Sequence, residues 1–399
     1  MEDRSMALEL SYILITPYTI LKSRTGGVIA RLLARTDLEL VGAQMLTPTR
    51  ELTEKYAELL KKTASSKAAD IISDYVLNNF TPSEDGTKRR VLMLLFRGEN
   101  ACSKLYTIAG RLSPESRGAG EMRITGETVR DTYADLVFDR DGSLKYFEPA
   151  VLLPPDQEFA MEKLKLFADF ADTQENIADL HYDDKTDLER TLVIIKPDNW
   201  RYPSSKPGNI IDMFSRTGLR IIATKIYQMS VSDALEFYGP VQGVLREKLA
   251  PKIGDRIKDM IEKEFKIKLG ENASPKLSDL AGVPFADDQF FQIVEFMSGV
   301  RPDTCPKNKL NAPGLVKTMV LVYEGKKAVK KIRDVLGPTD PTKAPSGTIR
   351  KEYGQDVMVN TAHASDSPEN AQREMGIIKI QENNLSRIIK EFLAEKGYK

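Results

Sequence analysis

The chain has few cysteines, few histidines and one tryptophan. Its 399 residues include two cysteines, Cys102 and Cys305, which stand far apart and show no metal-ligand spacing. That pattern argues against a disulfide-stabilised fold and favours a reducing compartment. No apolar run approaches the roughly 20 residues that span a bilayer, and the acidic start, Glu2-Asp3, is unlike a signal peptide. We therefore expect a cytoplasmic protein without a membrane partner.

The chain also has no formal net charge at neutral pH. The 58 basic and 58 acidic side chains balance, so no overall field draws the chain to nucleic acid or to an anionic membrane. An anion must therefore be held by local donors. The hydrophobic fraction, 41%, is that of a globular protein, and 399 residues exceed one average core. This length indicates at least two domains.

Similar stretches recur in the same order in the two halves of the chain. Residues 12–17 and 191–197 are both short apolar strands closed by proline, and residues 92–98 and 317–325 are both strands that end in glycine. Helix-like stretches lie between them. Each half thus has the order of a split βαβ unit. The repeat predicts the α+β class, with two tandem ferredoxin-like (βαββαβ) domains whose antiparallel sheets carry helices on one face.

One of the two histidines, His363, is the candidate for chemistry. An imidazole can act as a nucleophile at neutral pH without first losing a tightly held proton. Ser367 followed by Pro368 is typical of a helix N-cap, which predicts that His363 lies in the turn before a helix. Glu374 on that helix could reach a ring nitrogen and fix the tautomer. A lone histidine in a turn is more often an ordinary polar residue, so the neighbouring motifs matter.

Side chains that could bind phosphate stand at the ends of predicted elements in the second half. A lysine and two arginines can neutralise a polyphosphate and stabilise a phosphoryl group in transfer, because that catalysis is mostly positioning and electrostatics. Taken singly, an arginine on a polar loop is usually a solvated charge or half of a surface ion pair. The candidate residues are Lys196, Arg333, Thr339, Arg350 and Asn360.

Four motifs in the second half together resemble a nucleoside diphosphate kinase. They agree with the family in type, order and spacing over about residues 190–380, and a degenerate version covers about residues 10–154. The motifs are a strand ending in Lys196-Pro197-Asp198, Arg333 before Leu336-Gly337-Pro338-Thr339, the loop Ser346-Gly347-Thr348-Ile349-Arg350, and Asn360-Thr361-Ala362-His363-Ala364-Ser365-Asp366-Ser367.

The resemblance implies phosphoryl transfer in two half-reactions. His363 would take the γ-phosphate of a nucleoside triphosphate as phosphohistidine and pass it to a diphosphate, with Glu374 orienting the ring and Ser365 supporting it. Mg²⁺ would arrive on the nucleotide rather than in a protein cage. Phosphate contacts are implied for Lys196, Arg333, Thr339 and Arg350, with Tyr238 nearby, ribose contacts for Lys196 and Asn360, and base contacts for Phe290 or Phe291 together with Val357.

The domain boundaries follow from the repeat and the linker composition. Pro154-Pro155 ends a degenerate first copy over residues 1–154, a helical and acidic linker covers 155–190, and the catalytic second copy covers 191–399. Relative to the family, the second copy carries insertions near 239–288, which enlarge a helical hairpin, and near 300–312. His181 lies in the linker without a partner motif, so we expect no chemistry there.

The first copy has lost the catalytic set. Thr16 stands where the lysine should be, and no histidine precedes His181. Arg130 is kept, but residues 139–143 replace the histidine motif. Without a nucleophile the first copy would be structural or regulatory. The tandem arrangement predicts that it packs on the second copy as a built-in pseudo-dimer partner, with further homo-oligomers left open.

Three classes of function are open to such a chain. The first is an active nucleoside diphosphate kinase acting on nucleoside tri- and diphosphates. The second is a catalytically weak or inactive nucleotide-binding or scaffolding member of that family, since fold alone does not separate the two. The third is a nucleic-acid-binding module, which the sequence does not support because it has neither a surplus of basic residues nor an aromatic strand motif. The enzyme is favoured because drift should have removed some of Lys196, Arg333, Thr339, Arg350, Asn360, His363 and Glu374, and all remain.

Overall fold

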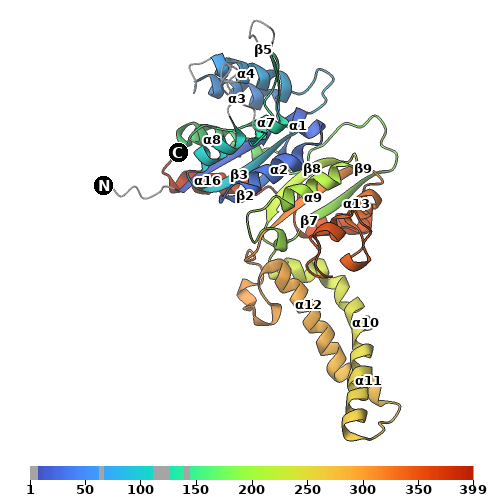
Figure 1. Ribbon diagram of the computed structural model, residues 1–399. Coiled ribbons are helices and arrows are strands. Elements are labelled where there is room, and N and C mark those ends of the chain that lie inside the picture. Colours follow the sequence, from blue (N-terminus) through green and yellow to red (C-terminus); the bar gives the residue numbers. More distant parts are fainter. Residues whose placement is uncertain (1–7, 63–66, 111–125, 139–143, 399) are drawn as a thin grey trace. The chain divides into compact units, whose positions relative to one another are not determined.

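The chain forms two compact units in the computed structural model, which describes residues 8–62, 67–110, 126–138 and 144–398 (Figure 1). The first unit contains Met1–Ile226, Met319–Met375 and Lys379–Lys399, and the second contains Tyr227–Thr318 and Gly376–Ile378. Both sheets lie in the first unit, because packing joins the two halves of the repeat. The domain boundaries near 154 and 190 stay a prediction.

The first sheet has four strands in the order β2-β3-β1-β6. Strand β1 pairs antiparallel with both β3 and β6. A separate pair, β4 and β5, precedes β6. The strands are β1 (Leu8–Ile15), β2 (Glu39–Leu46), β3 (Val91–Glu99), β4 (Asp135–Phe138), β5 (Leu144–Glu148) and β6 (Val151–Leu152), and the helices are α1 (Pro17–Leu21), α2 (Thr25–Ala34), α3 (Arg50–Lys62), α4 (Lys67–Phe80), α5 (Ala101–Ala109), α7 (Val129–Tyr133) and α8 (Gln157–Ala171).

The second sheet repeats this arrangement, in the order β10-β7-β9-β8. Its central strand β7 pairs antiparallel with β10 and β9, as β1 pairs with β6 and β3. Two antiparallel sheets of one topology confirm the predicted α+β, ferredoxin-like class. The strands are β7 (Leu188–Ile195), β8 (Arg220–Tyr227), β9 (Thr318–Lys326) and β10 (Ala362–Ala364), and the helices are α9 (Lys206–Ser215), α13 (Ala328–Leu336), α14 (Ile349–Tyr353), α15 (Pro368–Ile377) and α16 (Leu385–Glu395).

The central strands are covered on both faces. Residues 10–15 of β1 and 191–195 of β7 are all buried, and successive side chains of a strand point to opposite faces. The expectation of helices on one face only is therefore wrong. One face of the first sheet is covered by α3, α4, α8 and also α16, whose Leu385, Ile389 and Phe392 join that core. The carboxyl end of the chain thus completes the first copy.

Helices α2 and α9 pack backbone against backbone. A Cβ on Gly26 would lie 2.6 Å from the Asp212 Cα and the Gly208 carbonyl oxygen, and a Cβ on Gly208 would lie 2.5 Å from the Ala30 Cα. Real side chains essentially never come so close. The sequence places glycine at both positions because only glycine permits this approach. One helix comes from each copy, so this contact joins the two repeats.

The second unit is a helical hairpin. It consists mainly of α10 (Val231–Phe265), α11 (Ala273–Leu277), a short π-helical segment (Ser278–Gly282) and α12 (Val283–Ser298). Figure 1 shows α10 and α12 running side by side in opposite directions. A capping box formed by Ser230 and Asp233 begins α10. Within the described residues, no helix is both long and apolar enough to cross a membrane.

Candidate active site

His363 lies in the middle of β10, where it pairs with Ile194 of β7. The predicted turn before a helix is wrong, because sheet pairing extends through Ala364 before the chain turns into α15. The predicted N-cap is confirmed, since the Asn370 amide donates to the Ser367 hydroxyl at 3.1 Å. The histidine is held by the rigid edge strand of a sheet rather than by a loop.

Glu374 on α15 holds the imidazole. The His363 Nε2 lies 3.0 Å from a carboxylate oxygen of Glu374, and the Ser365 hydroxyl donates to the same oxygen at 2.6 Å. Ser365 and Glu374 are buried, whereas the His363 side chain is 21% exposed. The three predicted residues therefore come together, with the ring fixed on one side and reachable on the other.

Asn360 organises the residues around this histidine. Its side-chain oxygen accepts from the Lys196 ammonium at 2.7 Å, and its side-chain nitrogen donates to the backbone carbonyls of Thr339 at 3.2 Å and Val357 at 2.7 Å. Asn360 is 1% exposed. One buried amide thus ties together three segments that the sequence analysis had assigned to nucleotide binding. Its predicted ribose contact stays a prediction.

Two buried cations stand beside the histidine. Arg350 donates to the carbonyls of Gly337 at 2.9 Å and of Ala362, the neighbour of His363, at 3.0 Å. Lys196 follows β7, and burial, reinforced by repulsion from Arg350, lowers its pKa to about 8. Two like charges held close and largely out of water are stabilised by a bound anion.

Arg333, Thr339 and Val357 lie exposed on the second copy. Arg333 is on the outward side of α13, whose Val329, Ile332 and Leu336 are buried. Thr339 and Val357 are positioned through their backbone carbonyls by Asn360, which leaves their side chains at the surface. These residues are accessible to a nucleotide, and their contacts with it stay a prediction.

Tyr238 and Phe291 belong to the helical hairpin. Tyr238 on α10 is buried, with its ring centroid 4.9 Å from that of Phe237. The Phe291 ring on α12 lies 6.2 Å from that of Phe290 and 6.0 Å from the Arg301 guanidinium carbon. Both residues are in the second compact unit, and their predicted roles beside the phosphates and the base stay predictions.

Thr361 and Asn199, which were not among the predicted site residues, shape the turn that leads into β10. Thr361 has a left-handed backbone, φ +73°, and its carbonyl accepts from the Lys196 amide at 2.9 Å and the Asn199 side chain at 2.8 Å. This turn carries the chain from the buried Asn360 into β10. No sequence signal marks Thr361, because a left-handed threonine is uncommon and results from tertiary contacts.

In the first copy, the turn before β6 and the pairing of β6 match those of β10, but the side chains differ. The Thr16 amide donates to the carbonyl of Ala150, which is left-handed like Thr361, and Leu152 pairs with Leu14 as His363 pairs with Ile194. Leu152 therefore occupies the histidine position. Residues 139–143, to which the sequence analysis assigned the lost motif, lie outside the described residues. Arg130 still donates to the carbonyls of Gly110 and Val151.

Helix α8 follows β6 as α15 follows β10. Its N-cap is Asp156, and counting from the caps places Lys163 where Glu374 stands in the second copy. Lys163 is 2% exposed, and its ammonium donates to the Phe159 carbonyl at 3.0 Å. The first copy thus has Leu152 at the position of His363, Lys163 at that of Glu374 and Thr16 at that of Lys196.

In the part of the chain that the structure describes, no group of three or more His, Cys, Asp or Glu side chains forms a metal site. Asp198, which follows the first strand motif, is paired instead with the Lys206 ammonium at 3.3 Å. Burial raises the pKa of the Asp198 carboxyl, and Lys206 opposes that effect. This ion pair holds the loop that leads from Lys196 to α9.

One family of known proteins matches the part of the chain that carries this site. The nucleoside diphosphate kinase family model matches residues 189–246 and 312–384. The chain is 33% identical over 194 residues to a nucleoside diphosphate kinase of a Nitratiruptor species and 31% identical over 188 residues to that of Hydrogenovibrio crunogenus. These matches cover 97% and 90% of the relatives, and 49% and 47% of this chain.

Solved structures of the same kind are also similar. The Aquifex aeolicus nucleoside diphosphate kinase is 27% identical, with a TM-score of 0.29, and the Pyrobaculum aerophilum NDP kinase is 26% identical, with a TM-score of 0.31. Each alignment covers 48% of this chain and 94% of the other. The gap in the family match, 247–311, falls in the helical hairpin. Because the chain is more than 30% identical to these sequence relatives over nearly their whole length, it belongs to the nucleoside diphosphate kinase family.

Proposed function

We propose that the chain is an active nucleoside diphosphate kinase that transfers the γ-phosphate of a nucleoside triphosphate to a nucleoside diphosphate through a phosphohistidine at His363. The observation that carries this proposal is the hydrogen-bonded set of His363, Glu374 and Ser365 beside the buried cations Lys196 and Arg350. A scaffold that only bound nucleotides would have no use for a carboxylate locked on the imidazole.

The contact with Glu374 favours Nδ1 as the attacking nitrogen. An ionised carboxylate only accepts hydrogen bonds, so the Glu374 oxygen holds the proton on Nε2 and leaves a lone pair on Nδ1. The Nδ1 lone pair forms the bond to the γ-phosphorus while the bond to the β-phosphate oxygen breaks, and the diphosphate leaves. In the second half-reaction a different diphosphate attacks the phosphohistidine, and Nδ1 recovers its lone pair.

The cations would stabilise the transferred group electrostatically. Lys196 and Arg350 lie beside β10 and repel each other when no anion is present. A polyphosphate relieves that repulsion and places its terminal group near the ring, which is the positioning that phosphoryl transfer requires. The substrate is taken as the magnesium complex of the nucleotide, in which the metal neutralises phosphate charge. Exposed Arg333 and Thr339 complete the proposed phosphate contacts.

We propose further that the first copy is a structural partner. Leu152 and Lys163 leave it without a nucleophile or an orienting carboxylate, and α2 packs directly on α9. It would act as a pseudo-dimer partner that stabilises the second copy. A cytoplasmic location stays a prediction from the cysteine content.

The test is to incubate the protein with γ-labelled ATP and to look for an acid-labile, alkali-stable label. We expect the wild type to be labelled, to pass the label to added GDP, and to lose it in His363→Ala. His181→Ala is the matched control, because His181 is exposed, its Nε2 lies 3.3 Å from a carboxylate oxygen of Asp183, and it has no part in the set formed by Glu374, Ser365, Lys196 and Arg350. Labelling that survives His363→Ala would refute His363 as the nucleophile, and a wild type that binds nucleotide without labelling would favour the scaffold.

A further inference from the structure

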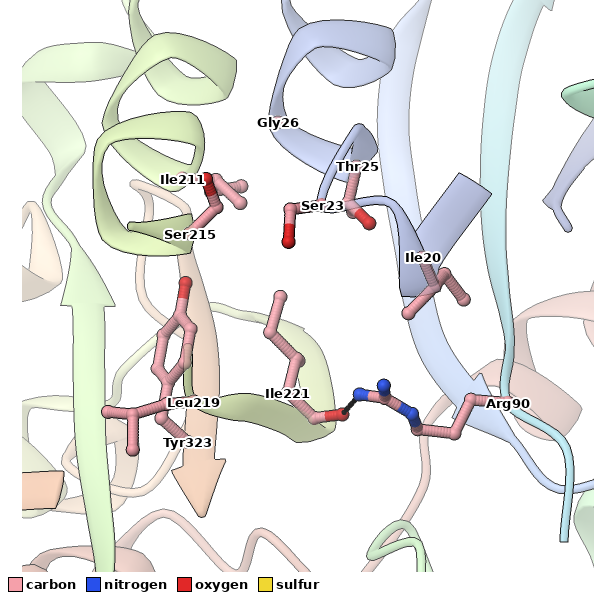
Figure 2. A pocket seen from close by; sticks show the side chains of 10 residues that line it. All are labelled: Ile20, Ser23, Thr25, Gly26, Arg90, Ile211, Ser215, Leu219, Ile221 and Tyr323. Carbon is pink, nitrogen blue, oxygen red and sulfur yellow. Dashed lines mark hydrogen bonds between the residues drawn. The ribbon is translucent and has the colours of Figure 1, made fainter. Parts of the chain in front are cut away.

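A small cavity lies where the two copies meet, away from His363 (Figure 2). It offers about 40 Å³ of space for the centres of water-sized molecules. Ser23, Thr25 and Arg90 line it from the first copy, and Ser215 and Tyr323 line it from the second. One water needs about 10–15 Å³ by this measure, so the cavity holds about three water molecules or one compact ion.

Tyr323 points an unsatisfied hydroxyl into this cavity. The residue is 1% exposed, and its hydroxyl has no hydrogen-bond partner among the described residues. Figure 2 shows the hydroxyls of Tyr323 and Ser23 pointing into the same space. A buried polar group without a partner costs free energy, which a ligand at this place would recover.

The repeat shows that packing does not require this hydroxyl. Tyr323 of β9 pairs with Thr191 of β7, and at the equivalent place in the first sheet Phe96 of β3 pairs with Ser11 of β1. Phenylalanine therefore fills the same position in a sheet of the same topology. The extra oxygen of Tyr323 lies where the second copy faces the cavity.

Arg90 supplies a cation. Its guanidinium donates to the Ile221 carbonyl at 2.9 Å, and no carboxylate in the described ranges forms an ion pair with it. Burial, reinforced by repulsion from Arg220, lowers the pKa of Arg90 to about 10. A partly buried guanidinium next to another cation and without a carboxylate is stabilised by an added anion.

The N-terminus of α2 faces the same space. Thr25 and Gly26 are its first residues, their N–H groups have no acceptor inside the helix, and the N-cap Arg24 makes no side-chain cap. The helix dipole adds positive potential there. Backbone N–H donors, a guanidinium and hydroxyls on apolar walls make a site that favours an anion.

We propose that this cavity is a binding site for a compact oxyanion of the size of orthophosphate, held by Arg90, the start of α2 and the Tyr323 hydroxyl. Because these groups come from both copies, the bound anion bridges the contact between them. The site is distinct from the nucleotide site and does not depend on the proposed reaction.

The test is thermal unfolding of the full chain in increasing orthophosphate, compared with sodium chloride at equal ionic strength. We expect phosphate to raise the midpoint of the wild type, and we expect the apparent affinity to fall about tenfold in Arg90→Met and severalfold in Tyr323→Phe. Both variants leave His363, Lys196 and Arg350 intact, so phosphate bound at the catalytic site contributes equally to all three proteins.

Tyr323→Phe gives the sharper outcome, because it restores the residue of the first copy. Without phosphate it should be as stable as the wild type or more stable, since it removes an unsatisfied hydroxyl; with phosphate it should be the less stable protein. Phosphotransfer by this variant should be unchanged. Equal phosphate dependence in the three proteins, or crystals grown in phosphate that hold only water in the cavity, would overturn the proposal.

Discussion

The contact between α2 and α9 makes a quantitative prediction for Gly208→Ala. A Cβ at Gly208 would lie 2.5 Å from the Ala30 Cα and from the Gly26 carbonyl oxygen, whereas ordinary contact begins at 3.4 Å. The clash is with backbone, which cannot rotate away, so the helices must separate by close to an ångström. Overpacking of this kind costs about 1–3 kcal/mol or more. The helix propensity of alanine returns about 1 kcal/mol.

Because this clash is with backbone, its cost lies at the upper end of that range, and after the gain in helix propensity we expect Gly208→Ala to lower the free energy of unfolding by about 2 kcal/mol or more. Urea unfolding followed by circular dichroism measures this loss. Gly243→Ala is the matched control: Gly243 is also inside a helix, α10, and a Cβ there meets nothing within 4 Å. That control should be neutral or stabilising by up to about 1 kcal/mol.

The double variant Gly26→Ala with Gly208→Ala tests whether the two glycines serve one contact. Each added methyl group would push the same pair of helices apart. The double variant should therefore lose less stability than the sum of the losses in the two single variants. A Gly208→Ala protein as stable as the wild type would refute direct backbone packing of the copies, and with it the structural basis for a pseudo-dimer.

Three further predictions concern the catalytic site. Glu374→Gln should slow single-turnover labelling of His363 by about 10–100-fold, because the amide loses the charge-assisted bond that sets the tautomer. Nucleotide affinity should fall as the pH rises through about 8, because binding requires the protonated Lys196, whose pKa lies there in the free protein; fluorescence of Trp200, titrated with ADP between pH 7 and 9, measures this, and Lys196→Met should remove the dependence. Leu152→His in a His363→Ala background should stay unlabelled with γ-labelled ATP, because Lys163 and Thr16 replace the carboxylate and the lysine.

Each of these predictions has an outcome that contradicts it. An unchanged labelling rate in Glu374→Gln would show that the ring is held by other contacts. A flat affinity across pH 8 would mean that Lys196 does not meet the phosphates. Labelling of the Leu152→His protein would show that the first copy retains a working site.

The sequence by itself determined the features that depend on neighbouring residues. The cap at Ser367, the helix that carries Glu374 and the capping box at Ser230 are formed within a few residues of chain, so their patterns are complete in the sequence. The motifs that contain His363 and Lys196 were also recognisable, because the order and spacing of residues in a motif are read from the sequence without knowledge of packing. The repeated order of strands predicted the fold class for the same reason.

Tertiary structure decided what depends on partners distant in the chain. His363 lies in a strand rather than a turn because β7 pairs with it, and the left-handed Thr361 is held by the Lys196 amide and the Asn199 side chain. The equivalence of Leu152 with the histidine appeared only through strand register. Likewise, the Arg90 and Tyr323 cavity joins residues more than two hundred positions apart. Burial and hydrogen bonding across such separations leave no local pattern, because the energy that selects them exists only after the chain has folded.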